Sequence, residues 1–255
     1  MQGHDLTLLT QAAQSAGVIA MSFWRLDPQV WHKADQSPLS EADLAVNTHL
    51  HDVLCRERPS YGWLSEETDD KSDRLGDDCI FIIDPIDGTR AFIAGETTFS
   101  ISMAVARQGQ ATAAVVYLPA LNRLYSAFAG GPAMKNGAEI TVASTKDIAG
   151  SAILANKAAF DSRHWSKGVP EAERVFRSSI AYRLCLVAEG RHDAMVAFGN
   201  INEWDVAAGS LIATCAGARV SDVRGETLHF NKYPPHSYGV LAAPGALHDK
   251  LRARM

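Results

Sequence analysis

The segment Cys79-Ile-Phe-Ile-Ile-Asp-Pro-Ile-Asp-Gly-Thr89 carries the strongest structural signal in the sequence. It begins with an apolar run, which is typical of a β-strand that is buried on both faces. Asp84 ends that run, and Pro85 then interrupts strand pairing because it has no backbone N–H. We expect the tight turn that follows to return Asp87 to the side of Asp84. Two carboxylates would then face one point at the end of a buried strand.

Three more acidic clusters lie at the ends of apolar segments. They are Ser40-Glu-Ala-Asp43, Ser65-Glu-Glu67 and Glu203-Trp-Asp205. Carboxylates that converge from separate elements suit Mg²⁺, which takes oxygen ligands in octahedral geometry and keeps water or phosphate in the other positions. Gly88 and Thr89 begin a predicted helical turn, whose unpaired N–H groups can bind a phosphate beside the metal.

Each acidic cluster also has a purely structural interpretation when it is taken alone. Asp87-Gly88 is common in turns, and Asp205 can cap the N-terminus of a helix. Ser40 and Asp43 have the spacing of a capping box. An EF-hand is excluded for 84–88, because the calcium ligands of that loop alternate every second residue. For each cluster by itself, a structural role and a metal-binding role both stay open.

Around the buried strand, the sequence predicts helices and strands that interleave in layers. The other predicted strands are 100–107, 111–118 and 123–128, which form an antiparallel meander, and 152–154, 194–198 and 238–242. The predicted helices are 6–23, 37–56, 180–190, 205–217 and a terminal segment. We expect two subdomains, residues 1–150 and 151–255, that share one continuous body.

Composition limits the classes of partner. The chain has 255 residues, is 47% hydrophobic and carries a net charge of -5. Its basic residues are scattered, so we expect no nucleic-acid polymer as a partner. No uninterrupted apolar run approaches the roughly 20 residues of a membrane span, and the acidic Asp5 does not fit a secretory signal. Four cysteines without a close pair favour a reducing cytoplasm.

Three segments, in this order, resemble the signature of the inositol monophosphatase superfamily. They are Trp63-Leu-Ser-Glu-Glu67, Ile83-Asp-Pro-Ile-Asp-Gly-Thr-Arg-Ala-Phe92 and Trp204-Asp-Val-Ala-Ala-Gly209. The D-P-x-D-G-T string alone would arise by chance in such a chain with odds of roughly one in ten thousand. The likeness extends from about Lys33 to Gly217. It implies an α/β (α+β) fold, a five-layered α-β-α-β-α sandwich, and a Mg²⁺-dependent phosphomonoesterase.

The resemblance implies two or three bound Mg²⁺ ions. Glu66, Asp84 and the carbonyl of Ile86 would hold the first ion. Asp84, Asp87 and Asp205 would hold the second. Two cations in such a site can generate a hydroxide at neutral pH and stabilise the leaving oxygen. No covalent nucleophile is needed, because phosphoryl transfer depends mainly on positioning and charge stabilisation.

The same resemblance implies roles for the neighbouring residues. Asp43 lies where the family contacts a third, more weakly held ion through water. Thr89, paired with Glu66, would orient the attacking water, while the N–H groups of Gly88 and Thr89 would bind the substrate phosphate. Glu67 would lie next to the metal-binding residues without contacting the ions itself. A homodimer and inhibition by lithium are also implied.

Three substrates stay open, namely a 3'(2'),5'-bisphosphate nucleotide, inositol 1-phosphate and histidinol phosphate, and we favour the nucleotide. Family members that act on inositol usually carry an acidic residue seven positions before Asp205, where this chain has Phe198. A phenyl ring can pack against a base or ribose, although it can equally be an inward strand residue. Arg90 also favours the nucleotide, because inositol enzymes more often carry a neutral residue after the Gly-Thr pair. Arg183 favours it as well, because nucleotidases often carry at this position a lysine that can meet a second phosphate. The alternative for both arginines is a solvated surface charge. The predicted substrate-binding residues are Gly88, Thr89, Ser178, Ser179, Arg183 and Phe198.

A non-catalytic regulator that retains the fold is the alternative from a different class of protein. The loss of one metal-binding carboxylate would favour that alternative. All four core positions are carboxylates in this chain, so the sequence favours an enzyme.

Overall fold

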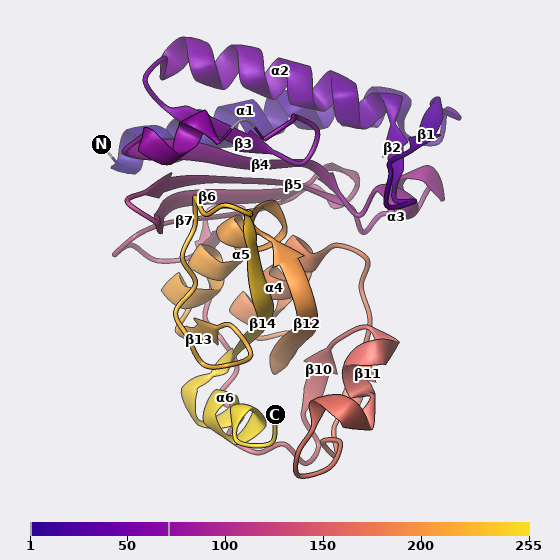
Figure 1. Ribbon diagram of the computed structural model, residues 1–255, viewed down its shortest axis with the longest axis vertical. Helices are drawn as coiled ribbons and strands as arrows, with labels where there is room; N and C mark the ends of the chain where they lie inside the picture. The colour runs from indigo at the N-terminus through magenta and orange to yellow at the C-terminus, as the bar shows by residue number, and fades with distance from the viewer. Residues whose placement is uncertain (1, 71) are drawn as a thin grey trace.

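The computed structural model describes residues 2–70 and 72–255, which form five alternating layers of helices and sheets (Figure 1). Helices α1 (Gln2–Phe23) and α2 (Glu41–Glu57) make the first layer, and a seven-stranded sheet makes the second. Helices α4 (Ile180–Ala188) and α5 (Glu203–Cys215) lie between this sheet and a five-stranded sheet. Helix α6 (Gly245–Arg252) covers the far side. The predicted α-β-α-β-α sandwich is therefore confirmed.

The seven-stranded sheet is built around β4, the apolar segment of the sequence signature. In spatial order its strands are β3 (Gly62–Ser65), β4 (Cys79–Asp87), β5 (Ser100–Arg107), β6 (Gln110–Leu118), β7 (Arg123–Phe128), β8 (Met134–Lys135) and β9 (Ala138–Glu139). Strands β3 and β4 are parallel and all other pairs are antiparallel. The predicted meander, β5 to β7, is confirmed. Strand β4 is buried from Ile80 onward, as its apolar side chains require.

Helix α1 packs closely on the seven-stranded sheet because the residues of the helix that face the sheet have small side chains. Ala16 and Ala20 are fully buried, and a Cβ at Gly17 would lie 2.4 Å from the ring of Tyr117. Over Gly3–Phe23 this helix is also long and apolar enough to cross a membrane, by length and composition only. A core helix of a soluble protein passes the same test, so the expected absence of a membrane partner stays a prediction.

The five-stranded sheet comes from the second half of the chain. In spatial order its strands are β11 (Glu173–Val175), β10 (Ala152–Leu154), β12 (Ala194–Asn202), β14 (His236–Pro244) and β13 (Ala218–Ser221). Strand β10 runs parallel to β11 and β12, while β14 runs antiparallel to β12 and β13. The strands of the two sheets come from 62–139 and 152–244. The division into two subdomains near residue 150 stays a prediction.

The central helices α4 and α5 approach each other closely because small residues face the contact. Ala207 and Ala208 are buried, and a Cβ at Gly209 would lie 2.7 Å from Cβ of Leu184. A larger residue at 209 would therefore push the helices apart. Because Asp205 lies one turn earlier on α5, this close packing also fixes its carboxylate beside the start of α4.

Two helix boundaries near the site differ from the predictions. The predicted helix 37–56 begins only at Glu41, because 38–40 forms the short strand β2 (Pro38–Ser40), which pairs with β1 (Val30–His32). Helix α5 begins at Glu203, so Asp205 lies inside its first turn and is not the N-cap. Strands of three residues carry too little periodicity to be recognised in a sequence.

Candidate active site

Strand β4 ends in a bulge that turns two aspartates to the same side. Side chains 84 and 87 are an odd number of residues apart, so a regular strand would point them to opposite faces. In the pairing with β5, Asp84 is opposite Ser102 and Asp87 is opposite Ser100, so β4 contains one extra residue. Such a bulge re-aims the side chains that follow it. The predicted return of Asp87 to the side of Asp84 is therefore observed.

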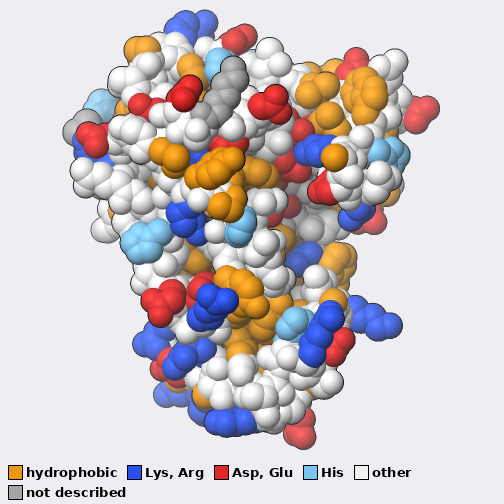
Figure 2. All heavy atoms as spheres, in the orientation of Figure 1, with side chains coloured by type: hydrophobic (Ala, Val, Ile, Leu, Met, Phe, Trp, Pro, Cys, Tyr) orange, Lys and Arg blue, Asp and Glu red, His pale blue; other side chains and the backbone are white. Residues whose placement is uncertain are grey.

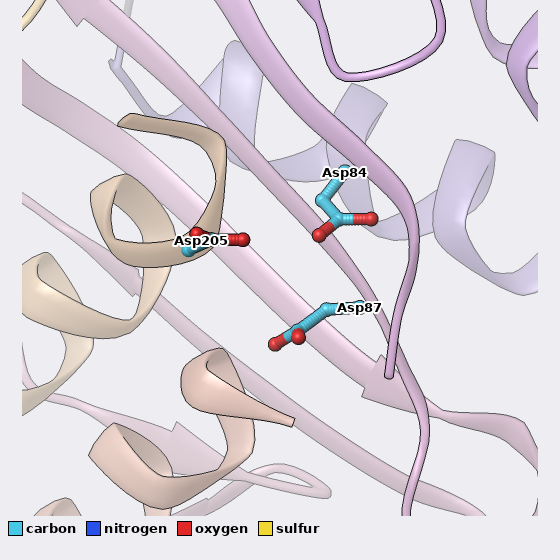
Figure 3. Close-up of side chains that lie close together, drawn as sticks. All are labelled: Asp84, Asp87 and Asp205. Atoms are coloured by element: carbon cyan, nitrogen blue, oxygen red, sulfur yellow. The ribbon is translucent and has the colours of Figure 1, made fainter. Parts of the chain in front are cut away.

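Helix α5 adds a third carboxylate to this pair (Figure 3). One carboxylate oxygen from each of Asp84, Asp87 and Asp205 lies within 4.8 Å of the others. The side chains of Asp84 and Asp87 are buried, and that of Asp205 is half-buried. Strand β4 and helix α5 thus bring together three of the four carboxylates that the sequence pattern singled out as the core ligands.

The charge of this group is not balanced by the neighbouring side chains. Oδ1 of Asp84 is buried without a hydrogen-bond partner among the described residues. Burial, followed by the charges of Glu66, Asp87 and Asp205, raises the pKa of Asp84 well above its ordinary value. Burial and the charge of Asp87 also raise the pKa of Asp205. A hard cation would supply the missing partner of Asp84 and offset the repulsion, so the residues fit a metal site.

A cavity of 570 Å³ opens beside the carboxylates. In Figure 2 acidic side chains gather in the recess between the two halves of the molecule. The predicted site residues that line the cavity are Glu66, Asp84, Ile86, Asp87, Gly88, Thr89, Ser178, Arg183 and Asp205. A larger cavity of 960 Å³ lies between α1 and α2. Within residues 2–70 and 72–255, the group of carboxylates that could hold a metal ion lines the 570 Å³ cavity and not the larger one. We therefore assign the chemistry to the 570 Å³ cavity.

Helix α4 holds Asp87 in place through its N-terminus. Oδ2 of Asp87 accepts hydrogen bonds from Ser179 Oγ at 2.6 Å and Ala181 N at 2.7 Å, and Oδ1 accepts one from Ile180 N at 3.2 Å. Burial raises the pKa of Asp87 to about 6, although these hydrogen bonds oppose the rise. Ser179 was predicted to bind substrate, but it is fully buried, caps α4 and orients Asp87 instead.

Lys33 bridges the two neighbouring glutamates of the first signature segment. Its Nζ lies 2.8 Å from Oε1 of Glu66 and 2.8 Å from Oε1 of Glu67. Burial lowers the pKa of Lys33, but the two carboxylates outweigh it and the net pKa is raised. Burial raises the pKa of Glu67 to about 7. No local sequence pattern predicts this contact, because Lys33 lies in the turn between β1 and β2, far from the glutamates along the chain.

Thr89 pairs with Asp43, and not with Glu66 as the family resemblance implied. Thr89 Oγ1 lies 3.2 Å from Asp43 Oδ1 and 3.1 Å from the carbonyl oxygen of Ile86. Asp43 also accepts a hydrogen bond from Ser40 N at 2.8 Å, which completes the predicted capping box of α2. Burial raises the pKa of Asp43 to about 6, while the Ser40 hydrogen bonds lower it. One aspartate therefore both caps α2 and contacts Thr89.

The turn between β4 and the short helix α3 (Thr89–Ile93) requires glycine. Gly88 has φ of 98°, and a Cβ there would lie 3.4 Å from the carbonyl oxygen of Thr98. The N–H groups in the first turn of a helix have no intrahelical partner, so those that begin α3 can bind an anion. Arg90 also lines the cavity and adds positive charge.

Phe198 does not line the cavity, which corrects its predicted contact with substrate. Its ring stacks on His164 with centroids 4.2 Å apart and an interplanar angle of 13°. Its edge contact with Trp165 has a centroid separation of 5.6 Å. These contacts attach Phe198 to the apolar cluster on the outer face of the five-stranded sheet. The alternative interpretation, an inward strand residue, describes it better.

Arg183 is a buried cavity residue and not a solvated surface charge. Its side chain donates from Nε to Arg177 O at 2.5 Å and from Nη2 to Ser178 O at 3.3 Å. Burial lowers the pKa of Arg183, whereas the charges of Asp87 and Asp205 raise it. The guanidinium therefore lies within the field of the carboxylate group.

Known proteins match this chain over almost its whole length. Residues 3–255 match the profile described as the Inositol monophosphatase family. An inositol-1-monophosphatase of Mesorhizobium japonicum is 32% identical, covering 86% of each chain. The 3'(2'),5'-bisphosphate nucleotidase CysQ of Shigella flexneri is 31% identical, covering 88% of this chain and 93% of the relative.

The solved structure of an inositol monophosphatase from Thermotoga maritima superposes with a TM-score of 0.84 and 27% identity, covering 99% of this chain and 96% of the other. The fold, the carboxylate group and these matches agree. The chain therefore belongs to the inositol monophosphatase family, whose members are metal-dependent phosphatases that act on small phosphate esters.

Proposed function

We propose that this phosphatase uses Mg²⁺ and that the unbalanced carboxylate group is its metal site. The observation that carries the proposal is the buried Oδ1 of Asp84, which has no hydrogen-bond partner among the described residues although the carboxylates of Asp87 and Asp205 converge with that of Asp84. The proposed ligands are Glu66, Asp84, the Ile86 carbonyl, Asp87 and Asp205, with Asp43 in contact with a third ion through water. When bound, the ions would supply positive charge to the phosphate and lower the pKa of a water molecule.

The residues of the chain would position the reactants. The single proton of the Thr89 hydroxyl can be donated to Asp43, which leaves the oxygen lone pairs to accept a hydrogen bond from the attacking water. Glu66 is the proposed acceptor of a proton from that water, and the Gly88 and Thr89 N–H groups would hold the phosphate. The water oxygen bonds to phosphorus, the ester bond breaks, and the leaving oxygen takes up a proton to depart as an alcohol.

Removal of divalent cations is expected to abolish phosphate release and Mg²⁺ to restore it. The physical reason is that a divalent cation held by the carboxylates would both neutralise the phosphate and acidify a water molecule. The measurement is phosphate release from inositol 1-phosphate and 3'-phosphoadenosine 5'-phosphate after dialysis against EDTA, with and without added Mg²⁺. Binding should also raise the melting temperature, because the ion binds only the folded cluster. Full activity in EDTA would contradict the proposal. Lithium inhibition of the restored activity is proposed on family resemblance.

We further propose a 3'(2'),5'-bisphosphate nucleotide as the substrate, ahead of inositol 1-phosphate and then histidinol phosphate. Relatives named for the first two substrates have almost equal identity to this chain, 31% and 32%, so identity does not discriminate between them. Arg183 supports the nucleotide, because a buried guanidinium in the cavity can bind a second phosphate. Its Nη1 has no hydrogen-bond partner within the described chain.

Substitution Arg183→Ala is expected to lower kcat/KM for 3'-phosphoadenosine 5'-phosphate more than for inositol 1-phosphate. A hydrogen bond to a charged group contributes about 1.5–3 kcal/mol, which corresponds to a change of roughly 10- to 100-fold. The ratio of kcat/KM for the two substrates is the measurement, with Arg219→Ala as a control because Arg219 is exposed and pairs with Asp249. An unchanged ratio, or a parent enzyme that prefers inositol 1-phosphate, would reject the second-phosphate role.

A homodimer and a cytoplasmic location also belong to this proposal. The four cysteines are free, which supports a reducing compartment. The dimer is proposed from family resemblance alone.

A further inference from the structure

Phe176 is a large apolar side chain exposed at the wall of the active-site cavity. The residue is 49% exposed and lines the cavity together with Asp205 and Gly88. It directly follows β11 and lies in the short segment that leads to α4, the helix whose N-terminus holds Asp87. A scattered exposed phenylalanine needs no explanation by itself. This ring, however, projects from the segment that positions a proposed metal ligand.

The Arg183 guanidinium lies over one face of the Phe176 ring. The guanidinium carbon lies 4.7 Å from the ring centroid, within the range of a cation–π contact. The guanidinium itself is fixed, because it donates to the carbonyl oxygens of Arg177 and Ser178 and the residue is only 5% exposed. Three consecutive residues of the segment, 176–178, are thus tied to one buried side chain. The ring is held in place before any ligand binds, which reduces the entropy lost on binding.

An aromatic ring that is fixed beside the phosphate-binding turn favours a leaving group with a planar ring of its own. Nucleobases have a π face that stacks on an aromatic side chain, and an arginine adds a cation–π contribution. A cyclic polyol instead presents hydroxyl groups, which lose their water partners against a phenyl ring. The stacking role that the sequence suggested for Phe198 is not available to that residue, because its ring is covered by His164.

We infer that Phe176, held in place by Arg183, is the residue on which the planar ring of the leaving group stacks. The enzyme would therefore select phosphate esters of nucleosides over those of polyols. The inference rests on the proposed phosphatase function and adds a specificity-determining residue to it. Arg183 acts here as a positioning residue for the ring, in addition to its proposed contact with the second phosphate.

The test compares Phe176→Ala and Phe176→Trp on two substrates in the presence of Mg²⁺. For 3'-phosphoadenosine 5'-phosphate, Phe176→Ala is expected to lower kcat/KM about tenfold, or about 1.4 kcal/mol, mainly through KM. For inositol 1-phosphate we expect a change of less than about twofold, because the polyol does not stack. Phe176→Trp should retain the nucleotide activity. Tyr233→Ala, which removes another exposed aromatic ring (67%), is the matched control, and all melting temperatures are compared.

The outcomes separate this inference from the proposed function. Equal losses on both substrates, or no loss on the nucleotide, would overturn the stacking role of Phe176 while the phosphatase function stands. Hydrolysis of inositol 1-phosphate without binding of the nucleotide would also overturn the stacking role of Phe176 and leave the phosphatase function standing. If the parent protein hydrolyses neither substrate, the proposed function fails, and calorimetry with adenosine 5'-monophosphate still decides the inference: Phe176→Ala must weaken that binding about tenfold, and unchanged binding overturns it.

Discussion

Substitution Asp84→Asn is expected to lower kcat/KM by several orders of magnitude while leaving the metal-free protein at least as stable as the parent. The carboxylate of Asp84 is the proposed contact to both ions, and asparagine keeps its size but removes the charge that holds them. The amide would also present N–H donors toward the cations. Activity and Mg²⁺ affinity should therefore be lost together.

The expected gain in stability follows from the direction of the pKa shift. The pKa of Asp84 is higher in the folded state than in the unfolded chain, mainly through burial and then through the charge of Glu66. A raised pKa means that ionised Asp84 destabilises the metal-free fold, and that this cost grows as the pH rises above the unfolded value. Asn carries no charge, so the cost is absent at neutral pH. Mg²⁺ should stabilise the parent and stabilise the variant far less.

Three measurements check this prediction, namely kcat/KM with Mg²⁺, calorimetric Mg²⁺ binding, and the melting temperature without and with the ion. Asp147→Asn is the matched control, because Asp147 is exposed and pairs with Lys250 on the surface. Near-normal turnover of Asp84→Asn would reject the assignment of Asp84 as a metal ligand. A large loss of metal-free stability would show that its role is structural.

Substitution Thr89→Ala is expected to reduce kcat by about 10²- to 10⁴-fold, the usual contribution of a group that assists proton transfer. The Thr89 hydroxyl lies between Asp43 and the Ile86 carbonyl at the edge of the cavity, where it can orient a water molecule. Removing it takes away that orientation but none of the proposed ligands. Mg²⁺ affinity should stay close to that of the parent.

The alternative for Thr89 is a structural role at the start of α3. One lost hydrogen bond would then lower the free energy of unfolding by about 0.5–1.5 kcal/mol with little effect on kcat. Thr89→Ser is the matched control, because serine keeps the hydroxyl and should keep most of the activity. Steady-state kinetics and chemical denaturation of both variants distinguish the two roles. Retained activity with reduced stability in Thr89→Ala would leave the residue a purely structural one.

The sequence by itself determined the framework of the fold and most of the carboxylate group. The apolar run before Asp84 required a buried strand, and Pro85 with the glycine at 88 required the bulge and turn that follow. These features are local, because they depend on side-chain hydrophobicity and on backbone restrictions within a few residues. The same holds for the meander and for helix α1. The three signature segments then supplied the family.

Only the tertiary structure decided which side chains meet. Lys33 bridges Glu66 and Glu67, and Ser179 orients Asp87, through contacts between segments that are far apart in sequence. Such contacts leave no periodicity or spacing to recognise. The sequence also carries no signal that shows whether Phe198 or Phe176 lines the cavity. Phe198 lies within β12 and its ring stacks on His164, whereas Phe176 directly follows β11 and its ring contacts Arg183. Which of the two rings faces the cavity is set by the packing of the two halves of the chain around the carboxylates.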